Sequence, residues 1–229
     1  MPALEIAVTS AAAAAAAIAH GADRVELCTA LEVGGVTPSQ ATVDATLAVC
    51  ADTHVLVRSR PGDFVYDADE IAQMASDAAA IAEQGAAGVV IGALRPDGRL
   101  DLDAITRMGD AARAARPDVA ITVHRAIDAC ISHVGGVEDL LGSGLPITRI
   151  LTSGGAAAAG EGVVTIADMV GAAGGRIQIM AGGGVTLATI PALVAAGVDA
   201  VHMSAKRSRR DHFTMDPELV EAAGALVGR

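Results

Sequence analysis

Short apolar runs alternate with longer alanine-rich segments along the whole chain. The runs have the length and composition of buried strands, and they begin near residues 4, 24, 54, 88, 119, 147, 177 and 198. The segments between them have helical composition and plausible starts, such as Ser10 before the first and Thr37 followed by Pro38 before the second. Eight strand–helix units predict an α/β fold, a (β/α)8 TIM barrel with residues 1–229 as a single domain. A doubly wound open sheet has the same alternation and is the alternative, although eight units without an inserted domain favour closure.

Several of these runs carry polar residues on one side. In the run that starts at Ala120, Ile121 and Val123 share one face and Thr122 and His124 share the other, because strand side chains alternate. Other strands repeat this pattern with the residues Glu5, Arg24, Glu26, Cys28, Arg58, Arg60, His202 and Ser204. An unpaired charge inside a barrel is costly, so such residues persist only when they are paired or functional. Two interpretations stay open, an interior salt-bridge network such as Glu26 with Arg58 and a built site, and both can hold at once.

The functional face of a TIM barrel lies beyond the carboxyl ends of its strands. The sequence places there Cys28, Arg58, Arg60, Asp63, His124, Arg125, Asp128, Thr152, Ser153, Gly182, Gly183, Gly184 and Ser204. Backbone N–H groups of a glycine-rich turn after strand seven, joined by those after strand eight, hold phosphate in many barrels. The basic run at residues 206–210 strengthens this anion interpretation. A tight helix entry explains the glycines almost as well, and Asp128 could also cap the fifth helix.

Composition and charge narrow the choice of partners and compartment. The net charge of −11, the absence of Trp and an aromatic content of 1% argue against a nucleic-acid partner. The longest early apolar run, residues 11–19, is too short to span a membrane, and the N-terminus does not resemble a signal peptide. Three widely spaced cysteines fit a reducing cytoplasm, and no dinucleotide-binding fingerprint indicates a nucleotide cofactor. We expect a cytoplasmic protein, with a homodimer or other homo-oligomer as a further expectation.

A set of motifs in consistent order links the chain to a known family. They are RVELC at 24–28, GGVTPS at 34–39, RSRPGDF at 58–64, HRAID at 124–128, LTSG at 151–154, MAGGGV at 180–185 and HMSA at 202–205. Over residues 4–212 the chain thereby resembles the CutC copper homeostasis family. The resemblance implies a TIM barrel, a cytoplasmic location and a link to copper tolerance, with Cu(I) bound through cysteines. One family cysteine matches Cys28, whereas Ala7 occupies the position of its partner on the first strand.

Two hypotheses for the function follow. In the first, the chain binds Cu(I), with Cys28 as ligand, because Cu(I) prefers soft thiolate or thioether donors. In the second, it is an enzyme acting on a small anionic or phosphorylated substrate, with Glu26, His124 and Arg58 as catalytic residues. The ligand-binding residues would then be Arg60, Asp63, Arg125, Asp128, Ser153, Gly182, Gly183, His202 and Ser204. A histidine that exchanges protons near neutral pH and a Glu26 kept ionised by nearby arginines are expected in this second case.

Overall fold

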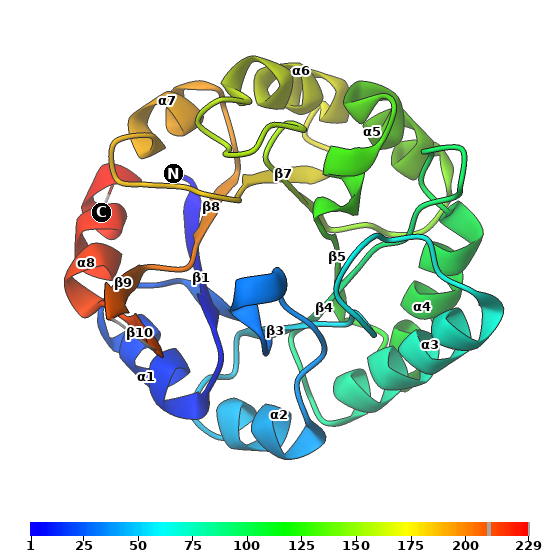
Figure 1. The fold of residues 1–229 in the computed structure, drawn as a ribbon, viewed down its shortest axis with the longest axis horizontal. Helices are drawn as coiled ribbons and strands as arrows, with labels where there is room; N and C mark the ends of the chain where they lie inside the picture. Colours follow the sequence, from blue (N-terminus) through cyan, green and yellow to red (C-terminus); the bar gives the residue numbers. More distant parts are fainter. Residues whose placement is uncertain (210–211, 229) are drawn as a thin grey trace.

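A computed structural model describes residues 1–209 and 212–228 of the chain. Its central feature is a closed barrel of eight parallel strands in the order β1 to β8, with β8 returning to pair with β1 (Figure 1). The strands are β1 (Ala3–Val8), β2 (Arg24–Leu27), β3 (Thr53–Leu56), β4 (Gly88–Ile91), β5 (Ala120–Val123), β6 (Arg149–Thr152), β7 (Gln178–Ala181) and β8 (Ala200–Met203). The predicted (β/α)8 TIM barrel is therefore confirmed, and the open-sheet alternative is wrong.

Helices surround this barrel on the outside (Figure 1). In the described residues they are α1 (Ala11–Ala19), α2 (Gln40–Leu47), α3 (Ala68–Glu83), α4 (Leu102–Ala115), α5 (His133–Gly142), α6 (Val163–Ala173), α7 (Ile190–Ala195) and α8 (Pro217–Leu226). The apolar core lies between the two layers, where Leu4 and Ile6 of β1 are fully buried. Glu5, between them in sequence, is also buried but has polar partners, as the alternation of strand side chains requires.

The helix starts show where local sequence signals are sufficient. The Ser10 hydroxyl accepts a hydrogen bond from the Ala13 N–H and caps α1 as predicted. The predicted start of the second helix at Thr37 and Pro38 is wrong, because α2 is capped by Ser39 instead. The Thr37 hydroxyl donates to the carbonyl of Arg58 and accepts from its N–H, which ties the loop after β2 to the loop after β3.

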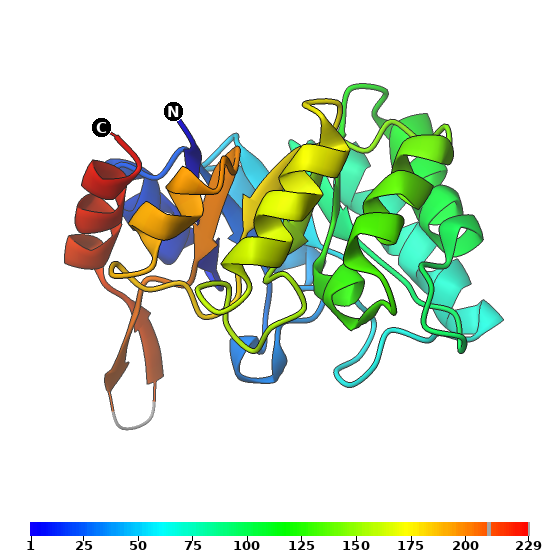
Figure 2. The ribbon, with the colours of Figure 1, turned by 90° about the horizontal axis from the view of Figure 1, so that it is seen from above.

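A two-stranded antiparallel hairpin, β9 (Lys206–Arg209) and β10 (His212–Met215), follows the barrel. It projects from the end of the barrel opposite to the N-terminus (Figure 2). The predicted basic run at residues 206–210 falls on this hairpin, and its side chains beyond Lys206 lie outside the described ones. Within the described part of the chain, the helices are all too short or too polar to cross a membrane.

Candidate functional site

A chain of four buried ionisable side chains crosses the inside of the barrel. The Arg24 Nε donates to Glu5 at 2.5 Å, and the other carboxylate oxygen of Glu5 lies 2.8 Å from His202 Nδ1. His202 Nε2 lies 3.4 Å from the carboxylate of Glu26. Strand register explains the chain, because Glu5 of β1 lies opposite Arg24 of β2 and opposite His202 of β8. An interior charge network was expected, but the pairing of Glu26 with Arg58 is wrong.

The pKa of each carboxyl and of the imidazole in this chain depends on which charged groups lie next to it. Burial raises the pKa of Glu26 to about 7, repulsion from Glu5 also raises it, and the charge of His202 opposes both. Burial disfavours the charged His202, but Glu26 and the bond to Glu5 outweigh it and raise the pKa of His202 above its usual value. Burial likewise opposes ionisation of Glu5, yet His202 and Arg24 hold the pKa of that carboxyl well below its usual range. The expectation that arginines keep Glu26 ionised is therefore wrong, because Glu5 takes the guanidinium of Arg24.

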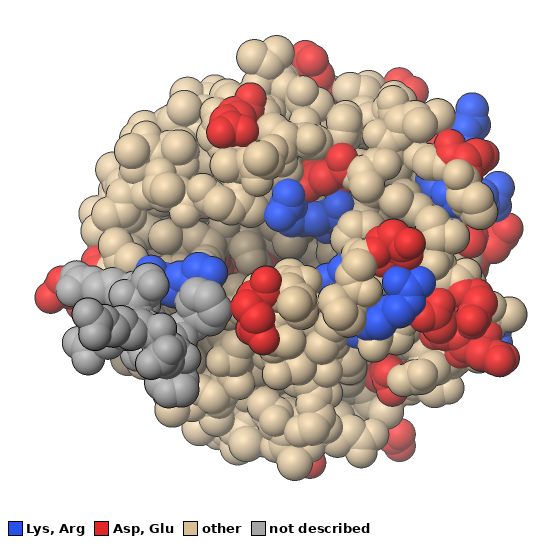
Figure 3. Space-filling model, in the orientation of Figure 1, with Lys and Arg blue, Asp and Glu red and all other residues tan. Residues whose placement is uncertain are grey.

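A cavity of about 220 Å³ opens over this chain at the carboxyl ends of the strands. Figure 3 shows the hollow at the centre of this face, with Lys and Arg side chains around it. The predicted site residues that line the cavity are Glu26, Cys28, Arg58, His124, Arg125, Gly183, His202 and Ser204. Its apolar walls include Ala7, Leu56, Phe64, Leu151 and Met203. Because position 7 carries only a methyl group, space is left beside Glu26, its register partner on β2.

Arg58 lies at the edge of the cavity, but its guanidinium already has protein partners. It donates to the carbonyls of Val33, Gly35 and Gly62, and its Cζ atom lies 4.8 Å from the centre of the Phe64 ring. These bonds hold together the loops that follow β2 and β3. Arg58 therefore brings positive charge to the cavity wall and fixes the shape of that wall.

Arg60 and Asp63 do not line the cavity. The Arg60 guanidinium pairs with Glu70 at 2.5 Å and with Asp63 at 3.0 Å, on the outside of the barrel. The prediction that Arg58 and Arg60 grip one anion together is wrong, because β3 ends at Leu56 and strand alternation no longer holds beyond it. Both acidic partners of Arg60 have a pKa below the usual value because they accept hydrogen bonds from it.

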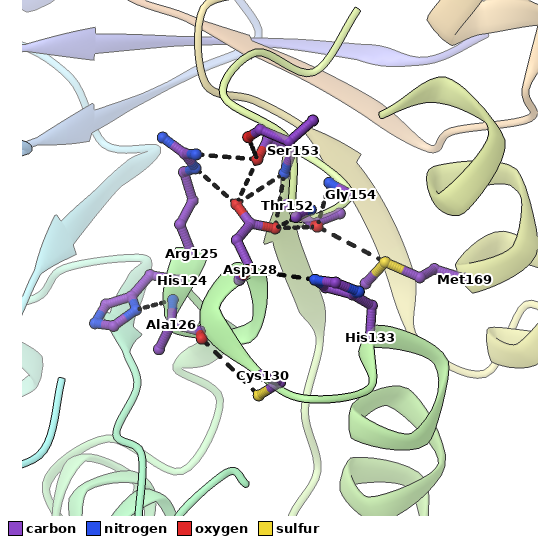
Figure 4. A network of polar contacts seen from close by, with 12 residues as sticks. His124, Arg125, Ala126, Asp128, Cys130, His133, Thr152, Ser153, Gly154 and Met169 are labelled. Carbon is purple, nitrogen blue, oxygen red and sulfur yellow. Dashed lines mark hydrogen bonds and ion pairs between the residues drawn. The ribbon is translucent and has the colours of Figure 1, made fainter. Parts of the chain in front are cut away.

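Asp128 organises the turns that follow β5 and β6 (Figure 4). Its carboxylate accepts hydrogen bonds from the Thr152 hydroxyl, from the N–H and hydroxyl of Ser153, and from Arg125 Nε at 2.7 Å. Arg125 also donates to the Ser153 hydroxyl oxygen at 2.9 Å, so two side chains fix its guanidinium at the cavity edge. Asp128 does not cap the fifth helix, because Ser132 caps α5. Asp128 and Ser153 thus act on the cavity through Arg125 and do not line it themselves.

The glycine-rich turn after β7 contributes partly by its lack of side chains. A Cβ atom on Gly183 would lie 2.7 Å from the guanidinium carbon of Arg125, so only glycine lets the turn approach so closely. Gly183 also has a φ of +94°, which other residues rarely adopt. Gly182 does not line the cavity, and a Cβ there would meet Leu151 and His202. The turn therefore places backbone next to the arginine, where an anion would also bind.

His124 follows β5 and has an imidazole that is almost fully buried against Phe64, with the ring centres 5.0 Å apart. Its Nδ1 accepts a hydrogen bond from the Ala126 N–H at 3.1 Å. Burial lowers the pKa of His124 to about 3, and the charge of Arg58 lowers it further. The expectation that His124 exchanges protons near neutral pH is therefore wrong, because the ring stays neutral.

The residues around the cavity offer a poor fit for Cu(I). Cys28 is 1% exposed, and burial together with the charge of Glu26 raises the pKa of its thiol, so the thiolate is disfavoured. Met203 is the other sulfur side chain that lines the cavity, whereas Cys130 contacts the Ala126 carbonyl outside it. The described groups close enough together to hold a metal ion are Glu5, Glu26 and His202. These are nitrogen and oxygen donors, whereas Cu(I) prefers sulfur.

Three residues that matter here are absent from the predicted site residues. Glu5 was placed inside the barrel by alternation, but nothing local showed that it would join His202 and Arg24. Phe64 contacts both His124 and Arg58, and its signal was its rarity, since the chain has two Phe residues. Lys206 lines the cavity as the first residue of the basic run.

The closed (β/α)8 barrel, with a cavity of ionisable side chains at the carboxyl ends of its strands, places this protein in the class of TIM-barrel proteins. The family model described as the CutC family matches residues 2–207, and the chain belongs to the CutC family. It is 40% identical over 227 residues to the family protein CutC of Sinorhizobium medicae, covering 99% of this chain and 89% of that protein. The CutC protein of Xanthomonas campestris is 44% identical over 209 residues, which cover 89% of this chain and 83% of that protein.

A solved structure supports the same assignment. The chain superposes with a TM-score of 0.79 and 27% identity on a protein from Streptococcus agalactiae described as a copper homeostasis protein CutC. The match covers 89% of this chain and 99% of that protein. A thiamine phosphate pyrophosphorylase from Pyrococcus furiosus has a TM-score of 0.63 at 13% identity, which shows a common fold alone.

Proposed function

We propose that this chain is an enzyme that binds a small anionic molecule in the cavity and moves protons with Glu26. The observation that carries the proposal is the Glu26 carboxyl itself, which lines the cavity with its pKa raised to about 7. A carboxyl with this pKa accepts and returns protons at cellular pH, as a general base must. His202, Glu5 and Arg24 hold it in place from below through the chain of ion pairs.

The charge around the cavity supports an anionic substrate. Arg58, Arg125 and Lys206 all border it, although the chain as a whole carries a net charge of −11. Arg125 is held in place by Asp128 and Ser153, so little conformational entropy is lost when it binds a carboxylate or a phosphate. The backbone of Gly183 and Gly184 adjoins the same space.

A thermal-shift screen tests this proposal. Phosphorylated and carboxylate metabolites are screened as separate sets, and at least one is expected to raise the Tm, since a ligand at 100 times its Kd adds about 2.7 kcal/mol of stability. The Arg125→Gln variant should need at least ten times more ligand for the same rise in Tm. Arg95→Gln is the matched control, because Arg95 forms a surface pair with Asp103 away from the cavity. If no compound of either set shifts the Tm, the proposal fails.

Cu(I) binding at Cys28 is the rival hypothesis that the family's link to copper supplies. Its structural basis is that Cys28 and Met203 line one cavity. The buried Cys28 thiol is hard to ionise, however, and the Arg and Lys side chains around the cavity favour an anion over a copper ion. We therefore expect Cys28→Ser to leave Cu(I) uptake unchanged in a competition assay with a chelator of known affinity. A loss of most of the uptake in Cys28→Ser, with Cys50→Ser unaffected, would favour copper over the anion.

Compartment and assembly complete the proposal. The three cysteines are free and buried, as suits a reducing cytoplasm. A homodimer remains a prediction, which light scattering on the purified chain would test.

A further inference from the structure

One ring nitrogen of His124 has a hydrogen-bond partner within the protein, and the other has no partner among the described residues. Its Nδ1 accepts the Ala126 N–H, so in the neutral imidazole the proton lies on Nε2. Nε2 is buried and has no hydrogen-bond partner among the described residues. A buried N–H without a partner costs free energy, and such groups concentrate at functional sites. His124 lines the cavity that also contains Glu26, so a bound molecule is the natural partner for this N–H.

The surroundings of His124 keep it a donor. The guanidinium of Arg58 and the ring of Phe64 pack on each other, the Phe64 ring lies beside the imidazole, and Asp128 is the acidic group that acts on it from its own turn. Burial and the positive charge of Arg58 outweigh Asp128, so protonation of the ring is disfavoured. A neutral imidazole of this kind can donate a hydrogen bond to an oxygen that becomes negatively charged.

On the basis of the function proposed above, we infer that the substrate is a small carbonyl compound with an anionic group. Glu26 removes a proton from the carbon next to the carbonyl, and His124 Nε2–H donates a hydrogen bond to the carbonyl oxygen. The anionic group, a carboxylate or a phosphate, is held by Arg125 and Lys206.

The step balances without another reactant. The C–H bond breaks, its proton passes to the Glu26 carboxylate, and its electron pair forms the carbon–carbon double bond of an enolate. The carbonyl π electrons move onto the oxygen, which His124 stabilises through the Nε2–H hydrogen bond. Return of the proton from Glu26 to the same carbon re-forms the carbonyl compound, and its return to the opposite face of the planar enolate makes the reaction an epimerisation. The reaction class is proton abstraction next to a carbonyl.

Binding of planar enolate mimics to the whole chain tests the inference, with tetrahedral compounds of equal charge type as references. In the phosphate arm, phosphoglycolohydroxamate is compared with glycerol 3-phosphate, and in the carboxylate arm oxamate is compared with lactate. By calorimetry, we expect the planar mimic to bind at least tenfold more tightly in the arm that matches the substrate. His124→Phe should abolish this preference, and His124→Gln, which restores an N–H donor, should recover part of it.

His54→Phe is the matched control, because His54 is also buried with one unpartnered ring nitrogen, but it does not line the cavity. It should keep the preference. Long-range ¹H–¹⁵N spectra of the unmodified chain provide a readout independent of whether the variants fold. They should show the Nε2–H tautomer of His124 without titration between pH 5 and 8.

The outcomes separate the two levels of the proposal. Equal binding of planar and tetrahedral compounds overturns the inference about His124 and leaves the anion-binding enzyme standing. A preference that survives in His124→Phe, an Nδ1–H tautomer, or an imidazolium above pH 5 also overturns the inference. If none of the four compounds binds while the thermal-shift screen finds another anion, the substrate assignment fails and the proposed function stands. If that screen also finds none, both fail.

Discussion

The carboxyl of Glu26 shows how single side chains acquire their chemistry in this barrel. Arginines lie near it in sequence on β2 and after β3, and a carboxyl beside arginines is normally ionised. In the structure, Glu5 takes the guanidinium of Arg24 and backbone carbonyls take that of Arg58. Glu26 is left with His202 at 3.4 Å as its ion-pair partner, and burial then raises its pKa to about 7. Glu26 can act as a base because the nearby arginines already bind Glu5 and backbone carbonyls and do not pair with it.

This raised pKa predicts a pH-dependent cost to folding. In the unfolded chain the Glu26 pKa is close to the ordinary value of 4.5, so below pH 4.5 both states hold the proton and there is no cost. As the pH rises from 4.5 to about 7, the unfolded state loses its proton first, so the cost grows and then stays constant. Glu26→Gln should therefore be more stable than the unmodified chain by roughly 1–3 kcal/mol at pH 8, and by much less at pH 5. Urea unfolding at the two pH values measures the difference.

Glu138→Gln is the control for this experiment, because Glu138 is exposed on α5. It should show no such difference between pH 8 and pH 5. A Glu26→Gln chain that is less stable at pH 8 than at pH 5, relative to the unmodified chain, would contradict the raised pKa.

At the scale of elements, the turn η2 (Arg125–Ala129) after β5 is built against the turn after β6. Asp128 bridges them, since its carboxylate accepts from the Thr152 hydroxyl and from the backbone and hydroxyl of Ser153. The Gly155 N–H adds a longer bond at 3.3 Å. One carboxylate therefore replaces the strand pairing that ends at these positions, and it holds Arg125 at the edge of the cavity.

Asp128→Asn tests this bridge. The amide replaces one acceptor oxygen by a donor, which leaves buried N–H and O–H groups facing the wrong partner, so we expect a loss of about 2–4 kcal/mol in urea unfolding. Anion binding should weaken as well, because Arg125 loses an anchor. Asp139→Asn, on the exposed face of α5, should change neither quantity by a measurable amount. A stable Asp128→Asn chain with normal anion binding would remove Asp128 from the site.

Elements differ in how well their local signals predict them. The strand starts follow from apolar runs, and the cap at Ser10 follows from a side-chain oxygen next to helix N–H groups. Both depend on near neighbours in the sequence. The start of α2 was misplaced because Thr37 bonds to Arg58, twenty-one residues away, and leaves the cap to Ser39. Asp128 does not act as the cap that its position suggested for a similar reason, because its partners Thr152 and Ser153 lie at the end of the next strand, β6.

At the scale of the whole molecule, closure of the barrel creates the site. The pairing of β8 with β1 places His202 beside Glu5, nearly two hundred residues apart in sequence, and β2 adds Glu26. The closed barrel also brings the glycine-rich loop after β7 close to Arg125, which Ser153 holds in place (Figure 4). Ser204 and Lys206, which follow β8, line the same cavity. Lys and Arg side chains thereby border the hollow, with Asp and Glu side chains also at its rim, on a protein with a net charge of −11 (Figure 3).

The sequence by itself determined the alternation of strands and helices, the phase of Glu5, Glu26 and His202 toward the barrel interior, and the family. These depend on periodicity and on order along the chain. Only the tertiary structure decided which charges pair, that Arg60 turns away to Glu70, and that His124 Nδ1 accepts a hydrogen bond from the Ala126 N–H. These depend on burial and on distances between residues of different strands, and such quantities exist only once the barrel has closed.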